Sequence, residues 1–173
     1  MHKLAARLDN LNDWIGRGIA WLTVLMVINT VIILIGRDLF NFGRIWMQEL
    51  TTWMHASVFL LGAAYTLRTN EHVRVDIFYS RFSTRGKAWV NLLGTLLLLL
   101  PVCGFILYES WDYVFGARGS WQSMETSRQA GGLGFPAPSL LKTFMLLMPV
   151  LLSLQGIAIA LRAIVDIRAG KPD

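Results

Sequence analysis

The sequence predicts an all-α integral membrane protein with four transmembrane helices and both termini in the cytoplasm. Hydrophobic residues make up 54% of the 173 residues and charged residues only 16%, a balance outside that of ordinary soluble domains. Four stretches, 18–36, 50–67, 88–108 and 143–161, carry no charged residue. Each is close to the ~20 residues that a helix needs to cross about 30 Å of hydrocarbon. A soluble helical bundle would show charged residues on the outward faces of such helices, and these stretches have none.

The chain is expected to form a single membrane domain over residues 1–173. Its four spans are placed at 16–37, 47–68, 87–115 and 139–163. Pro101 and Pro149 fall inside the third and fourth spans, where each removes a backbone hydrogen bond, and kinks are expected there. Several glycines and prolines make 116–138 an irregular outer loop.

Short interfacial amphipathic helices are expected at 2–13 and 70–84. In the first segment Leu4, Leu8 and Leu11 recur at helical spacing, which is typical of a helix that lies on the membrane surface. The second segment has apolar residues at a similar spacing, with arginines that would reach water and lipid phosphate. An ordinary basic loop is the alternative for this second segment.

The basic residues set the orientation. Eleven of the 16 Lys and Arg residues lie in 1–17, 68–87 and 162–173, which share one side of the membrane in a four-span topology. Loops rich in Lys and Arg face the cytoplasm. Contact with membrane lipids of negative charge explains the net charge of +5, so nucleic acid is not expected as a partner.

Polar residues inside the spans are expected to find partners at the same depth. Asn29 in the first span and His55 in the second lie at similar distances from their outer ends, and we expect them to approach each other or to share a partner. The same argument pairs Thr95 in the third span with Gln155 in the fourth. Such hydrogen bonds fix helix register more than they hold the helices together.

A stripe of mostly small or polar residues follows one side of the second span. It consists of Glu49, Thr52, Ala56, Phe59, Ala63 and Thr66. Small residues allow close helix approach, so the stripe is interpreted as a packing face. Glu49 at the outer end of the helix is expected to pair with Arg44 or Arg37. The alternative for Glu49 is a carboxylate that carries a proton or a cation.

No catalytic, cofactor-binding or metal-binding residues are predicted. The three histidines and Cys103 are scattered over different depths, unlike the clustered ligands of a zinc site. A b-type haem uses two facing histidines, whereas only His55 lies in a span. The sequence contains no nucleotide-binding motif and no nucleophile with a nearby base. It therefore indicates a structural or transport subunit.

Several motifs resemble the small permease subunit of tripartite ATP-independent periplasmic (TRAP) transporters. The most specific resemblance runs over residues 62–76, from Gly-Ala-Ala-Tyr-Thr-Leu-Arg to His-Val-Arg-Val-Asp. Further matches are Trp-Met-Gln-Glu-Leu at 46–50, Glu-Thr-Ser at 125–127, Lys142, Met-Pro-Val at 148–150 and Leu-Gln-Gly at 154–156. The resemblance covers nearly the whole chain.

The resemblance implies a multi-pass subunit in the bacterial inner membrane. Its partners would be a large permease subunit, which carries the substrate and cation sites, and a periplasmic binding protein that delivers an organic acid. The driving cation would typically be sodium. The small subunit would brace the static scaffold of the large one, which agrees with the absence of a polar cavity lining in this sequence.

The resemblance also suggests roles for particular residues. The stripe from Glu49 to Thr66 would pack on the large subunit or within this chain. Four outer arginines would help to dock the binding protein or would contact lipid headgroups, namely Arg37, Arg44, Arg118 and Arg128. His72 and Asp76 are expected to form a local network with Arg68 or Arg74. Protonation of His72 during coupling is the weaker alternative.

Two other functions stay open at this point. The chain could be a haem-bearing membrane anchor of a respiratory complex, or it could be a homo-oligomeric channel.

Overall fold

Four long helical segments make up most of the chain. The computed structural model describes residues 2–69 and 82–169. The helices are α1 (His2–Phe40), α2 (Ile45–Arg68), α4 (Thr84–Gly94), the π-helical turn η1 (Thr95–Leu99), α5 (Leu100–Phe115) and α6 (Ala137–Ala169). Because α4, η1 and α5 follow one another without a break, we call them together the third helix. The described residues contain no strand.

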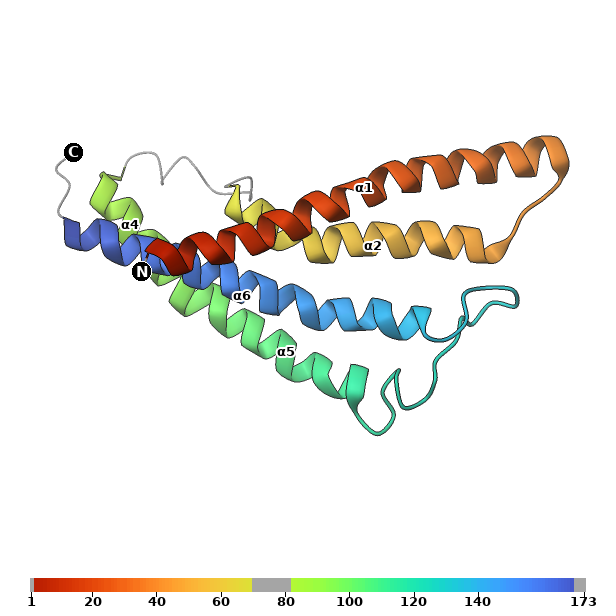
Figure 1. Cartoon of the computed structure of the whole chain (residues 1–173). Helices are drawn as coiled ribbons and strands as arrows, with labels where there is room; N and C mark the ends of the chain where they lie inside the picture. The colour runs from red at the N-terminus through yellow and green to blue at the C-terminus, as the bar shows by residue number, and fades with distance from the viewer. Residues whose placement is uncertain (1, 70–81, 170–173) are drawn as a thin grey trace.

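The helices run back and forth between two ends of the molecule. Loops 41–44 and 116–136 lie at one end, which we call the loop end (Figure 1). The start of α1 and the end of α6 lie at the other, the terminal end. This alternation is the one that the predicted topology requires.

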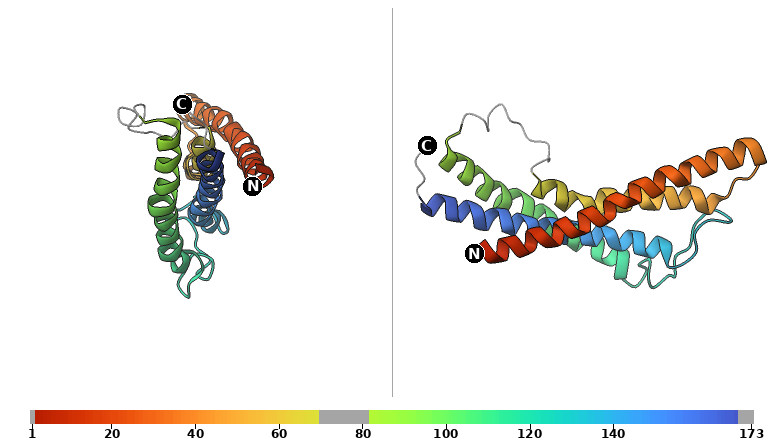
Figure 2. Two further views of the ribbon diagram at one scale, coloured as in Figure 1. Left: turned by 90° about the vertical axis from the view of Figure 1, so that its left-hand side faces the viewer. Right: turned by 45° about the horizontal axis from the view of Figure 1, so that its top comes forward.

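The helices form a flat array with α6 near its middle. α6 contacts α1, α2 and every part of the third helix, whereas the third helix packs chiefly on α6 alone. The end-on view shows α1 and the third helix at opposite edges, with α2 and α6 between them (Figure 2). A four-helix bundle would bury one side of every helix in a common core. This array instead leaves wide apolar surfaces uncovered.

Three helices are long and apolar enough to cross a membrane by length and composition. They are Ala5–Phe40, Arg85–Phe115 and Ala137–Arg168. α2 has 24 residues, which is enough for a crossing, but its Thr, Ser and His residues lower its hydropathy. That α2 also spans the bilayer, and that both termini are cytoplasmic, stay predictions.

Residues 2–13, expected as a short surface helix, are the first turns of the 39-residue α1. That these turns lie on the membrane surface stays a prediction. The side that packs inward carries Ala5, Asp9, Asn12 and Gly16, while Leu11 is exposed. These inward positions recur every three or four residues and so share one helix face. The segment thus presents polar and small groups to α2 and α6. The predicted helix at 70–84 falls largely outside the described residues.

The two prolines are accommodated differently. The N–H of Leu100 bonds to the carbonyl oxygen of Thr95, which closes a π turn directly before Pro101. The regular α-helical ladder is thus interrupted directly before Pro101, which has no N–H to donate. Thr95 and Leu99 in this turn lie against Gly156 of α6, where a Cβ would be 2.6 Å from the Leu99 side chain. Pro149 is buried within the unbroken α6.

α1 approaches α2 closely at Gly16. A Cβ on this residue would lie 2.5 Å from ring atoms of Tyr65 and 2.7 Å from its Cβ, which is far inside van der Waals contact. The missing side chain therefore allows the two helices to approach.

We expect Gly16→Leu to lower the free energy of unfolding by about 1–3 kcal/mol, because an overpacked contact forces the helices apart. Gly18→Leu is the matched control, since a Cβ there meets nothing within 4 Å and the gain in helix propensity is the same. Thermal unfolding in detergent measures both. Equal melting temperatures would show that Gly16 does not set the approach of α1 to α2.

Candidate functional site

Two polar clusters lie at opposite ends of the helix array. One joins α1, α2 and α6 toward the terminal end, and the other joins α2 and α6 to the loop 116–136. Within residues 2–69 and 82–169, no three His, Cys, Asp or Glu side chains are grouped so that they could hold a metal ion. The candidate sites are the two polar clusters and the exposed surfaces beside them.

The terminal-end cluster is built on Gln155, which is fully buried. The Asn12 amide donates to Gln155 Oε1 at 2.8 Å, and Gln155 Nε2 donates to Asp9 Oδ1 at 3.1 Å. Arg162 forms an ion pair with the other oxygen of Asp9. A chain of hydrogen bonds thus ties the start of α1 to α6.

A second group in this cluster ties α1 to α2. Asp13 forms an ion pair with Arg68, and it also accepts from Arg17 at 3.0 Å, one turn further along α1. The side chains of Asp13 and Arg68 are both mostly covered, so this pair is screened less than a surface pair. Arg68 was expected to contact His72 and Asp76, which lie outside the described residues.

The cluster also corrects the predicted pairing of Thr95 with Gln155. Thr95 is buried against Gly156, next to Gln155 along the chain, but the Gln155 amide is used by α1. Sequence reasoning treated 2–13 as a surface helix and so missed Asp9, Asn12 and Asp13. Their spacing continues the inward stripe of Gly16, and this was the signal that could have found them.

Asn29 and His55 do not meet. The Asn29 amide donates to the carbonyl oxygen of Met47 and to Thr51 Oγ1, both at 2.8 Å. These partners lie on α2, one or two turns closer to the loop end than His55. His55 is exposed on α2 and has no hydrogen bond within the described part of the chain.

The loop-end cluster is built on Glu49. One carboxylate oxygen accepts from the Leu133 N–H at 2.6 Å, and the other accepts from the Ser127 hydroxyl. A Cβ on Gly132 would lie 2.6 Å from both carboxylate oxygens, so the close approach requires glycine. The expected pairing of Glu49 with Arg44 or Arg37 is wrong, because the carboxylate fastens the loop instead.

Further bonds fasten the loop to α6, and one joins α2 to the start of α6. Lys142 forms an ion pair with Glu125 and lies 4.2 Å from the centre of the Tyr113 ring. The Trp121 indole donates to Thr143 Oγ1 at 2.9 Å, and the Trp53 indole donates to the carbonyl oxygen of Ala137 at 3.2 Å. Although 116–136 has no regular structure, its path is fixed by bonds to two helices.

A cleft of about 300 Å³ lies between the loop and α2. Its walls include Glu49, Thr52 and Trp53 from α2 and residues 125–128 from the loop. Arg128 at its edge is exposed. The cleft therefore combines carboxylate, hydroxyl and guanidinium groups at the loop end.

The other three predicted docking arginines are also exposed at the loop end. Arg37 bonds to Asp38 at 3.3 Å, and Arg44 lies 5.2 Å from the centre of the Phe42 ring. Arg118 follows the end of α5. The four arginines share one end of the molecule, but they do not form a single cluster.

The predicted stripe on α2 is partly uncovered. Phe59 is 72% exposed and Thr52 is exposed, whereas Ala56, Ala63 and Thr66 are half-buried. Together with His55, Thr52 and Phe59 give α2 an open side that carries polar groups.

We expect Glu49→Ala to speed amide hydrogen exchange at Leu133 by about ten- to a hundredfold, because a hydrogen bond to a charged group contributes about 1.5–3 kcal/mol. Gln48→Ala is the control, since Gln48 is exposed on the neighbouring position. Exchange followed by mass spectrometry measures both. Unchanged protection in the Glu49 variant would refute the fastening role.

We expect Gln155→Leu to destabilise the protein by about 1–3 kcal/mol, because it leaves the buried Asn12 amide without its acceptor. Asn12→Leu combined with Gln155→Leu should cost less than the two single changes together, since both partners are then apolar. Thermal unfolding in detergent measures the cycle. Strict additivity would mean that the two side chains are not coupled.

Comparison with known proteins gives the family. Residues 24–169 match the family described as tripartite ATP-independent periplasmic transporters, DctQ component. No curated protein and no solved structure matches the chain. The match covers the second half of α1, α2, the third helix, the loop 116–136 and α6. It agrees with the resemblance found in the motifs, and the chain therefore belongs to the DctQ family, the small permease component of TRAP transporters.

Proposed function

We propose that this chain is the small, non-catalytic subunit of a TRAP transporter in a bacterial inner membrane, and that it braces the large permease subunit. The transporter would take up an organic acid together with a cation, typically sodium. The binding sites for the acid and for the cation would both lie in the large subunit. The observation that carries the proposal is the flat array. None of the most apolar window of α1 and only 11% of that of the third helix is buried within this chain.

A flat array with uncovered apolar sides can pack on the surface of a larger subunit. Lipid and protein can both cover an apolar helix side, but a polar group in such a side favours protein. The open side of α2 carries Thr52 and His55 beside Phe59. We therefore assign this side, with the half-buried Ala56 and Ala63 at its border, to the large subunit.

The loop end is proposed to help dock the periplasmic binding protein. The loop is held in place by Glu49 and Lys142, and the exposed arginines around it would attract an acidic surface. Arg37 is already paired with Asp38. This leaves Arg44, Arg118 and Arg128 as the main contributors.

We expect Ala56→Trp or Ala63→Trp to reduce co-purification of the large subunit at least tenfold, because an indole at a helix contact separates the helices. Ala20→Trp on the exposed side of α1 is the matched control. The assay uses detergent extracts of cells that express both subunits. Wild-type chain that never co-purifies with the large subunit would refute the proposed function itself.

We expect Arg44→Glu, Arg118→Glu and Arg128→Glu together to lower uptake of labelled organic acids several-fold, while the membrane complex stays intact. The loss should shrink at higher ionic strength, since salt screens the attraction in the wild type. Uptake equal to the wild type would reject the docking role.

A further inference from the structure

A groove of about 480 Å³ lies on α1 where this helix meets α2. Most of its lining comes from α1, between Trp14 and Trp21, and Leu61 of α2 completes it. Trp14 is 78% exposed and Trp21 is 71% exposed. Gly18 shares their helix face, and a Cβ there would meet nothing within 4 Å. The groove is therefore open space between two indoles, over a position that has no side chain.

Arg17 brings a positive charge to the same groove. Its Nε lies 3.0 Å from Asp13, and most of its side chain is exposed. Asp13 also forms an ion pair with Arg68 of α2, so two guanidinium groups share one carboxylate. These three side chains keep one positive charge in excess, and Arg17 is the more exposed of the two arginines.

The groove begins where the apolar part of α1 begins. No charged residue follows Arg17 until Arg37, and the stretch between them is about 30 Å long as a helix, close to the thickness of the hydrocarbon core. The uncharged stretch of α2 ends at Arg68, which meets Asp13 one turn before Arg17. Tryptophan is enriched at such a border, at the level of the lipid headgroups. Trp21 lies one turn beyond Arg17, in the direction of the hydrocarbon.

The order of chemical groups along the groove matches that of a phospholipid. A guanidinium binds a phosphate through charge-assisted hydrogen bonds, and indole and aliphatic side chains cover an acyl chain without leaving a polar group unpaired. A zwitterionic headgroup brings a cation of its own, which Arg17 would repel. Basic residues at a membrane surface attract anionic lipids instead. A phospholipid of net negative charge is therefore the ligand that this groove fits best.

We propose that the groove binds one phospholipid of net negative charge, with its phosphate against Arg17 and an acyl chain over Gly18 between Trp14 and Trp21. The inference goes beyond the proposed function, because it assigns a ligand to this chain itself. It requires that α1 crosses the membrane, as its length and composition allow.

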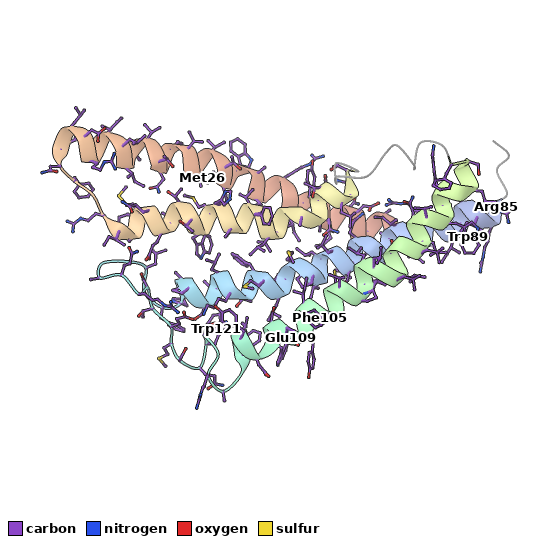
Figure 3. The ribbon with its side chains drawn as sticks, turned by 180° about the vertical axis from the view of Figure 1, so that it is seen from behind. Met26, Arg85, Trp89, Phe105, Glu109 and Trp121 are labelled. Carbon is purple, nitrogen blue, oxygen red and sulfur yellow. The ribbon has the colours of Figure 1, made fainter. Side chains whose placement is uncertain are left out.

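Arg85 and Trp89 make it possible to distinguish a lipid in the groove from the lipid that surrounds the whole protein. Both residues are exposed, and they lie one turn apart on α4 at the terminal end (Figure 3). Neither of them lines the groove. Surrounding lipid would contact this pair as well as the arginine and the indoles of the groove.

The test is native mass spectrometry of the full-length chain in detergent micelles that contain phosphatidylglycerol or, separately, phosphatidylcholine with the same acyl chains. The wild type should retain one phosphatidylglycerol per chain and at least fivefold less phosphatidylcholine. Arg17→Gln should reduce the retained phosphatidylglycerol about tenfold, because the phosphate loses its cation. Gly18→Leu should reduce it by a similar factor, because the new side chain fills the groove without meeting other parts of the chain.

Arg85→Gln is the matched control and should leave the retained phosphatidylglycerol unchanged. Melting temperatures of each variant in detergent without lipid establish that the fold is kept. Equal losses in the Arg17 and Arg85 variants, or equal retention of the two lipids by the wild type, would overturn the inference.

A second measurement identifies the occupant of the groove in cells. The photo-crosslinking amino acid benzoylphenylalanine in place of Trp21 should give an adduct with the mass of a phospholipid. A crosslink to the large subunit or to a second copy of this chain, with no lipid adduct, would show that protein covers the groove and would also overturn the inference.

Discussion

Inside a bilayer, contact between apolar helix sides has no advantage over contact with lipid, so helices are joined by close packing and by polar bonds. Two adjacent residues of α6 provide both. Gln155 is bonded to Asn12 and Asp9 of α1, while Gly156 allows the π turn of the third helix to lie against α6. This pair therefore connects both edges of the array to α6. The flat arrangement, and the open surfaces that follow from it, depend on this joint.

The two ends of the molecule are held by different means. At the terminal end, buried side chains from three helices bond to one another through Gln155 and Asp13. At the loop end, Glu49 of α2 and Lys142 of α6 hold an irregular segment that passes over the helix ends. Between these ends the helices present mainly apolar surface. This division agrees with a protein whose middle faces hydrocarbon and whose loop end faces water.

The sequence determined which segments are helices, and it located the irregular loop from its glycines and prolines. Family motifs added the class of transporter. The side that each residue turns to its neighbours was much harder to predict. The position of a residue along a span follows from counting residues, but the helix that its side chain faces depends on packing. Asn29 and His55 were expected at matching depths, yet Asn29 bonds to Met47 and Thr51, one or two turns nearer the loop end than His55. Leu11 marked the apolar side of the first turns, whereas Asn12 and Gly16 mark the side that packs within the chain. Glu49 had arginines near it in sequence, but its partner is a backbone amide 84 residues away.

Because Glu49 restrains the loop, it affects the rate and the affinity with which another protein could bind there. A flexible segment loses conformational freedom when it is captured, and that loss subtracts from affinity. Here the Leu133 amide, the Ser127 hydroxyl and the Lys142–Glu125 pair restrict the segment beforehand. A binding partner would therefore contact a preorganised surface. Its encounter would then be governed by diffusion and long-range charge, with little delay for rearrangement.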